Sequence, residues 1–278
     1  MSLTFMIEAL KFNKLKSRNT IKYIFLIVFL LNSLFLLFPL GDKDLSPFIN
    51  WVYNNGNLFN ETRYLLPDAN ANSILSWGNI IYLSSQLVMK LLNLAFVFLY
   101  GAIALGDYIG KPSSESIETY LKKIPQLLLF LALLIVPFVS GAFLFMLPFY
   151  IILTKLVFSM FYVYEDKEKL STALSESFYQ TKGITFSLVW SLIILEFVLS
   201  LIRNLLALLV PANIVGYSLI TAFSTAVSVF VIGRLFTLYY IYYAKINPRG
   251  LVRIEGSVFD IVDNIKHIQE EISGEPRD

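Results

Sequence analysis

Charged residues inside long apolar runs are the part of this sequence that could do chemistry. An unpaired charge in a lipid bilayer costs at least a few kcal/mol, so such groups pair with one another, line a wet cavity or bind a ligand. Lys90 and Glu196 are opposite in sign and, counted from the ends of their runs, lie at matching depth. The residues of this kind are Lys90, Lys155, Glu196, Arg203 and Arg234.

Polar side chains accompany these charges at helical spacing. Residues three, four and seven positions apart share one face of a helix, and polar faces inside a membrane point to a bundle interior or a wet cavity. Two interpretations stay open: a buried Lys90–Glu196 pair with small hydroxyl residues at the helix contacts, or a hydrated cavity that binds or passes a solute. The polar faces carry Gln86, Lys90 and Asn93; Glu196, Ser200 and Arg203; and Thr221, Ser224 and Ser228.

Lys155 and Arg234 form a second candidate site. Each lies about eight to ten residues from one end of its apolar run, at the side with most of the basic residues. Long basic side chains in such positions extend to the headgroup layer, and basic pockets between helices bind anionic lipid heads. We predict that the two residues hold a lipid headgroup or a phosphate in the inner leaflet.

The residues that most enzymes and metal sites need are absent. The sequence has no cysteine and one histidine, His267, which excludes thiolate ligands, clusters of His ligands and a Ser-His-Asp triad. Glu196 is the single acid within an apolar run, so no pair of acids shares a depth there. We therefore expect no enzyme, no metal, no cofactor and no nucleic-acid partner.

The elements that position these residues are membrane helices. Apolar residues make up 56% of the 278 and charged residues 15%, against about 45–50% and about 25% in soluble domains. A spanning helix needs about 20 mostly apolar residues. The composition predicts an all-α integral membrane protein with a transmembrane domain over 1–244 and a tail over 245–278. The predicted spans are 21–40, 80–105, 125–140, 142–163, 184–210 and 214–243.

The distribution of basic residues predicts the orientation. Loops on the cytoplasmic side of a membrane are enriched in Lys and Arg. On the side of the N-terminus we count 16 Lys and Arg residues, against two, Lys43 and Arg63, on the other. We therefore expect both termini in the cytoplasm, the loop 41–79 outside, and the protein in the cytoplasmic membrane.

Short amphipathic helices are predicted next to the spans. In the external loop, Ser46 followed by Pro47 is typical of a helix start, and Phe48 and Trp51 suit a helix or an aromatic belt in the headgroup layer. On the cytoplasmic side, three amphipathic stretches each precede a pair of spans, which suggests three units of a surface helix plus a membrane hairpin. They are Leu3–Leu15, Ser113–Lys123 and Lys167–Gln180.

The tail carries a seam of apolar residues. Their spacing of three and four residues is typical of a helix that packs against another surface, although two heptads are too short for an independent coiled coil. The helix either folds back onto the protein's own cytoplasmic face or docks on a partner or a second copy. The seam comprises Val258, Ile261, Ile265, Ile268 and Ile272.

One stretch of the chain resembles a known group. Residues 161–166 (FYVYED) precede 173–178 (ALSESF) and 181–183 (TKG), and Pro148 stands seven positions before Lys155. The pattern resembles a broad group of six-helix prokaryotic membrane proteins of unknown function, related to the membrane domain of glycerophosphodiester phosphodiesterases. The resemblance implies six helices and no catalytic site.

These observations predict a non-enzymatic protein with a packed polar interior. It would be an accessory or lipid/amphiphile-interacting component of the cytoplasmic membrane, with anionic lipids, a second copy or a membrane complex as partners. One alternative is a transporter or permease subunit with a cavity around Lys90, Glu196 and Arg203. Another is a scaffold that acts through the tail helix.

Overall fold

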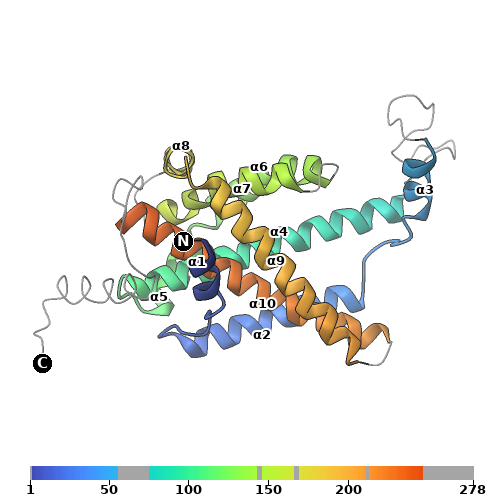
Figure 1. Cartoon of the computed structure of the whole chain (residues 1–278), viewed down its shortest axis with the longest axis horizontal. Coiled ribbons are helices and arrows are strands. Elements are labelled where there is room, and N and C mark those ends of the chain that lie inside the picture. The colour runs from blue at the N-terminus through green and yellow to red at the C-terminus, as the bar shows by residue number, and fades with distance from the viewer. Residues whose placement is uncertain (1, 56–74, 143–145, 166–168, 211–212, 247–278) are drawn as a thin grey trace, which may run out of the picture. The chain divides into compact units, whose positions relative to one another are not determined.

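Every regular element of the described chain is a helix (Figure 1). The computed structural model describes residues 2–55, 75–142, 146–165, 169–210 and 213–246, with the side chains of residues 2, 51–55 and 142 left out. The elements are α1 (Ser2–Ala9), α2 (Arg18–Leu37), α3 (Ser46–Asn55), α4 (Trp77–Tyr108), α5 (Ser113–Lys122), α6 (Ile124–Ala142), α7 (Leu147–Tyr164), α8 (Leu170–Gln180), α9 (Thr185–Leu208), α10 (Ile214–Tyr240) and the π-helix η1 (Ile241–Ile246).

Six of these helices are long and apolar enough to cross a membrane. They are α2, α4, α6, α7, α9 and the continuous helix Ile214–Ile246 formed by α10 and η1. This confirms the predicted all-α class with six candidate spans. Each of the six helices overlaps one predicted span, and the ends differ by a few residues because capping and packing decide where a helix stops.

The turn between the third and fourth spans differs from the prediction, which ended one span at 140 and began the next at 142, on either side of Gly141. Helix α6 continues through Gly141 to Ala142, and the left-handed conformation (φ 60°) falls on Met146. The Met146 amide donates to the Gly141 carbonyl over 2.7 Å. Pro148 then lies in the first turn of α7, where its missing amide proton costs no helical bond.

A short helix precedes each pair of spans, as predicted. Helix α1 comes before α2 and α4, α5 before α6 and α7, and α8 before α9 and α10. Helix α1 ends at Ala9, however, and does not reach Leu15. Its end is explained by turns in which the amides of Lys11 and Lys14 bond three residues back instead of four. Outside this series, α3 begins at Ser46, as the Ser-Pro pair predicts.

The described contacts divide the chain into two compact units. The first contains Met1–Ile21, Val97–Val198 and Phe230–Asp278, and the second contains Lys22–Phe96 and Leu199–Val229. Helices α2, α4, α9 and α10 contribute to both. Each unit is described by itself below.

Glycines allow the helices of the first unit to approach closely. A Cβ atom at Gly233 of α10 would lie 2.7 Å from the carbonyl oxygen of Val97 on α4, and one at Gly101 would lie 2.9 Å from the Phe161 ring of α7. Around them, the ring centroids of Phe161 and Tyr240 are 4.9 Å apart. Small residues of this kind are typical of helix contacts in membranes, where packing drives association.

In the second unit, a pair of side-chain amides joins α2 to α4. Asn32 of α2 and Asn93 of α4 are both buried. Each side-chain amide donates to the other's oxygen, over 2.9 and 3.0 Å. Phe25 of α2 also packs edge-to-face on Phe223 of α10, with centroids 5.7 Å apart.

Candidate lipid site and intramembrane polar groups

The junction of α7 and α8 surrounds Lys155 with contacts that fix its position. Lys155 lies half-way along α7, and its carbonyl accepts bonds from two buried hydroxyls, Ser177 of α8 (2.9 Å) and Thr181 at the C-cap of α8 (3.2 Å). The Lys155 ammonium lies 4.3 Å from the ring centroid of Phe178. Helix α8 thus crosses α7 at Lys155, and Figure 1 shows α8 almost end-on while α7 runs across the view.

The Lys155 ammonium is a cation without a counter-charge in the described residues. No carboxylate of the described chain lies within 4.0 Å of it. The Phe178 ring beneath it offers a cation–π contact but no neutralising charge. That ring is 53% exposed. The site is therefore basic, partly apolar and open on one side.

The TKG motif (181–183) follows α8, which stops at Gln180, the end of the predicted stretch Lys167–Gln180. Gly183 has a φ of +93°, a conformation that glycine adopts without strain. Thr181 bonds back to the Ser177 carbonyl of its own helix over 2.8 Å as well as to Lys155. The motif turns the chain from α8 into α9, and its Thr181 hydroxyl joins this turn to the backbone of α7.

Arg234, the predicted partner of Lys155, contacts α1. Its Nε donates to the Glu8 carbonyl over 2.9 Å, and the Glu8 carboxylate pairs with Lys11. The Tyr100 hydroxyl holds the same segment through the Phe12 carbonyl, at 2.7 Å. No described contact joins Lys155 to Arg234, so their joint anion site stays a prediction.

Glu196 has a neutral partner within the first unit. The Tyr150 hydroxyl of α7 donates to its Oε2 atom, a partner that the sequence analysis did not identify. Lys90 belongs to the second unit, where its side chain is exposed. The Lys90–Glu196 pair therefore stays a prediction, since the two units are not placed relative to each other.

The remaining residues of the predicted polar interior lie in the second unit. Asn93 points to Asn32 and Gln86 is half-buried. Arg203 donates from Nη2 to the Ser200 hydroxyl over 3.0 Å, whereas its buried Nε has no acceptor among the described atoms. Asn32 itself could have been found from the sequence, because an amide inside an apolar run needs a buried partner.

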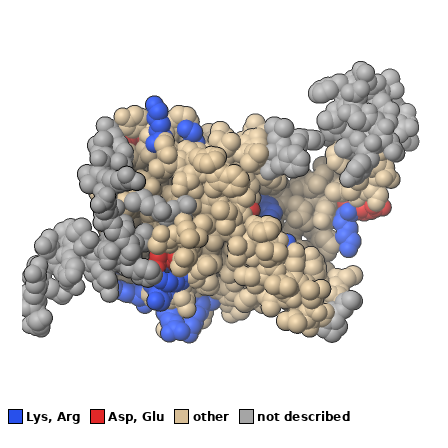
Figure 2. Space-filling model, in the orientation of Figure 1, with Lys and Arg blue, Asp and Glu red and all other residues tan. Residues whose placement is uncertain are grey.

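A basic cluster covers the connection between α1 and α2 in the first unit. Ser17 donates through its hydroxyl (3.0 Å) and amide (3.3 Å) to the Asp107 carboxylate at the end of α4. Lys14, Lys16 and Arg18 are exposed and form no ion pair within the described chain. Figure 2 shows blue side chains gathered over this connection and α5, while the surface over α6 and α7 is mostly uncharged.

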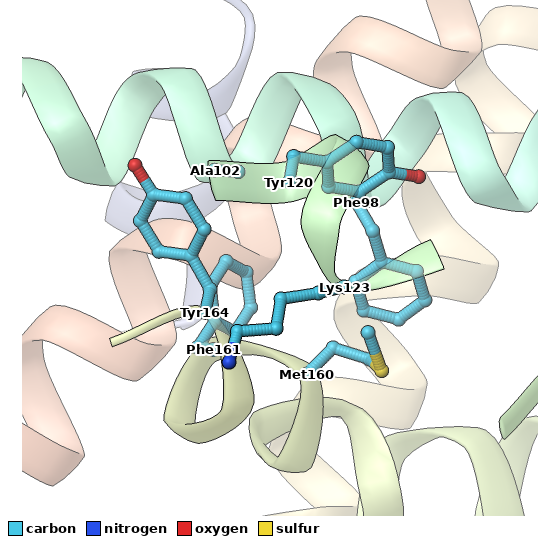
Figure 3. A pocket seen from close by; sticks show the side chains of 7 residues that line it. All are labelled: Phe98, Ala102, Tyr120, Lys123, Met160, Phe161 and Tyr164. Carbon is cyan, nitrogen blue, oxygen red and sulfur yellow. The ribbon is translucent and has the colours of Figure 1, made fainter. Parts of the chain in front are cut away.

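A small pocket lies among α4, α5, α7 and Lys123, the residue that follows α5 (Figure 3). Its volume of about 10 Å³ suffices for one water molecule and excludes a solute or an acyl chain. Burial raises the pKa of the Tyr120 phenol, which therefore stays neutral. The lining side chains are Phe98, Ala102, Tyr120, Lys123, Met160, Phe161 and Tyr164.

The π-helix η1 is held by side chains from α7 and α8. Lys245 pairs with Glu165, the Tyr240 hydroxyl donates to the same carboxylate over 3.1 Å, and Gln180 donates to the Tyr243 carbonyl over 2.5 Å. Glu165 belongs to the acidic pair of the 161–166 motif, so this acid has a structural partner. The apolar seam of the tail lies outside the described residues.

The six apolar helices make this a multi-pass membrane protein. Compared with family models, curated proteins and solved structures, the chain gives no match. Its resemblance to the six-helix prokaryotic group stays a prediction. Among the described residues, no three His, Asp or Glu side chains are grouped as a metal site would require.

Proposed function

We propose that this protein binds the phosphate of an anionic phospholipid at the junction of α7 and α8, as a non-enzymatic component of the cytoplasmic membrane. The observation that carries the proposal is the Lys155 ammonium. It stands in the middle of a spanning helix, above an exposed aromatic ring, without a carboxylate partner in the described chain. A cation in that position needs an anion or water, and the headgroup layer supplies both.

The chemistry around Lys155 suits a phospholipid better than a free anion. Phe178 is 53% exposed and presents an apolar face against which the glycerol and the first methylenes of a lipid can pack. Since the hydroxyls of Ser177 and Thr181 donate to the Lys155 carbonyl, they position the site, and the anion is recognised by the Lys155 ammonium.

The short helices support the predicted orientation, in which both termini lie in the cytoplasm. Helix α1 exposes Leu3 and Ile7, and the connection after it exposes Lys14, Lys16 and Arg18. Apolar and basic groups arranged in this way bind the surface of an anionic leaflet, with about 1 kcal/mol from each basic residue near it. This favours a cytoplasmic position for α1, α5 and α8, and with them both termini.

The wider role we propose is that of an accessory protein, as in the six-helix group that the 161–183 stretch resembles. The tail seam would then join a second copy or another membrane subunit. The transporter alternative has one observation in its favour, the buried Nε of Arg203 without an acceptor in the described structure, which suits an anionic solute in the second unit.

Lipid-dependent thermal stability tests the proposal. A ligand that binds only the folded protein stabilises it by about 2.7 kcal/mol at 100 times its Kd. Phosphatidylglycerol added to the detergent-purified protein should raise the Tm of the wild type more than phosphatidylcholine does. Lys155→Met should remove the difference, because it keeps the apolar stem and loses the charge, and Lys155→Arg should restore most of it.

Lys182→Met is the matched control, since it removes an exposed lysine close to the same junction. The proposal is wrong if the two Met variants respond to phosphatidylglycerol equally, or if the two lipids stabilise the wild type to the same extent.

A further inference from the structure

The outer face of α1 is an apolar surface that no described residue covers. Leu3, Ile7 and Leu10 are exposed, and their spacing of four and three residues places them on one side of the helix. The Leu10 amide donates to the Met6 carbonyl over 3.2 Å, so Leu10 continues the helical turn after α1 ends. The whole face belongs to the first unit.

Exposed basic residues follow this face in the connection to α2. Lys14, Lys16 and Arg18 form no ion pair among the described residues. The second unit has two described acids, Asp42 and Asp44, and both follow the opposite end of α2. We refer to the three apolar and three basic residues together as the α1 surface.

The described chain ends beside α1. The Phe5 ring of α1 lies 5.5 Å from the ring centroid of Tyr242 and 6.4 Å from that of Tyr243, both in η1. Ile246 is the last described residue. The 11 residues 247–257 that follow it can span at most about 40 Å, whereas α1 has eight residues and is about 12 Å long. The tail therefore starts within reach of the α1 surface.

The sequence of the tail complements the α1 surface. Its apolar seam over 258–272 has the same spacing of three and four residues as the exposed face of α1. Residues 254–275 contain six acidic residues and one lysine, so this part of the tail is opposite in charge to the connection between α1 and α2. Paired apolar seams exclude water, and charges beside them set the orientation of the two helices.

We propose that the tail packs on the α1 surface of its own chain and competes there with the anionic leaflet. The seam covers the apolar face of α1, and the acidic residues of the tail face the basic connection. This inference rests on the proposed function for its competitor, because the leaflet takes α1 only when the tail leaves it. A second copy or a subunit that binds the seam releases α1 to the membrane.

A photocrosslinker placed on α1 tests this contact. The sequence has no cysteine, so Leu3→Cys gives the intact chain a single thiol for benzophenone maleimide at a side chain that is 65% exposed. The labelled protein is placed in nanodiscs at one copy per disc, with phosphatidylcholine alone or with added phosphatidylglycerol. After irradiation, mass spectrometry identifies the crosslinked peptide. Leu121→Cys on α5, where the leucine is 54% exposed, is the matched control.

The expected result in phosphatidylcholine is a crosslink from Leu3→Cys to the tail, with a several-fold lower yield from Leu121→Cys. Phosphatidylglycerol should lower the yield several-fold, because its charge competes for the basic residues of the connection. Ile268→Asp places a charge in the seam and should abolish the crosslink. His267→Asp adds the same charge outside the seam and should retain it.

The proposal is overturned if the tail is not crosslinked from Leu3→Cys, if Leu121→Cys gives an equal yield, or if phosphatidylglycerol leaves the yield unchanged. A crosslink that forms only in discs with two copies also overturns it, since the contact then lies between chains. Ile7→Cys replaces Leu3→Cys should that variant not give a monodisperse protein. Failure of the Lys155 lipid site would leave this crosslink in place, and a missing crosslink would leave the lipid response of Lys155→Met unchanged.

Discussion

The two units fix their helices in different ways. In the first, hydroxyls bond to backbone carbonyls of neighbouring elements, as Thr181 does to Lys155 and Tyr100 to Phe12. In the second, the amides of Asn32 and Asn93 satisfy each other between two spans. In the first unit the Lys155 backbone holds α8, and its ammonium has no carboxylate partner among the described residues. In the second unit both polar side chains of the pair are used for the contact between helices. A bond through the backbone thus leaves the side-chain charge out of the contact that joins the helices.

The largest expected effect concerns the close helix contact of the first unit. Gly233→Leu should destabilise the protein by about 3 kcal/mol or more, because the new side chain meets the backbone of Val97, which has little room to move. Gly110→Ala is the control. Its φ of +79° makes the substitution strained, but no atom lies within 4 Å of the added Cβ, so about 1 kcal/mol is expected. Thermal unfolding in detergent measures both, and similar losses would contradict the packing argument.

The amide pair of the second unit should give the next largest effect. Asn32→Leu should cost about 1–2 kcal/mol, because it leaves the Asn93 amide buried without its partner. The double variant Asn32→Leu/Asn93→Leu should recover part of the loss, since no orphaned group remains. A double-mutant cycle on unfolding in detergent measures the coupling. Additive losses would show that the two amides act independently.

A smaller effect is expected where α8 is fastened to α7. Thr181→Val removes the hydroxyl bonds to Lys155 and Ser177 at nearly constant volume, which should cost about 1 kcal/mol. Trypsin should then cut faster at Lys182. Thr172→Val on the exposed side of α8 is the control, because its hydroxyl bonds only to the Lys169 carbonyl. Equal cleavage rates in the two variants would show that the Thr181 hydroxyl does not hold α8 against α7.

The smallest effect is electrostatic and lies on α5. The hydrogen bond and charge of Lys122 hold the pKa of Glu118 below its ordinary value. Because the folded-state pKa is lowered, any stabilisation is present above the unfolded-state pKa and is lost as pH falls through the folded-state value. Both side chains are exposed, so we expect no measurable change in Tm. In Lys122→Gln, an NMR titration should show the Glu118 pKa returning to its ordinary range.

The sequence allowed the scaffold to be predicted more fully than the contacts. Spans such as 184–210 and the start of α3 at Ser46 follow from apolar length and from the Ser-Pro pair, which act locally. The Tyr150–Glu196 and Asn32–Asn93 contacts depend on how helices distant in sequence rotate against each other. A lone tyrosine in an apolar run carries no spacing signal for that rotation, so the sequence does not identify Tyr150 as a partner of Glu196.

The retention of anionic lipid by variants at Lys155 tests the central claim most directly. The wild type, Lys155→Met and Lys182→Met are extracted from the same membrane, and phosphatidylglycerol bound to each is counted by native mass spectrometry. Our account predicts that Lys155→Met loses a phosphatidylglycerol molecule that the wild type and Lys182→Met retain. Equal retention by all three proteins would contradict a lipid site at the junction of α7 and α8.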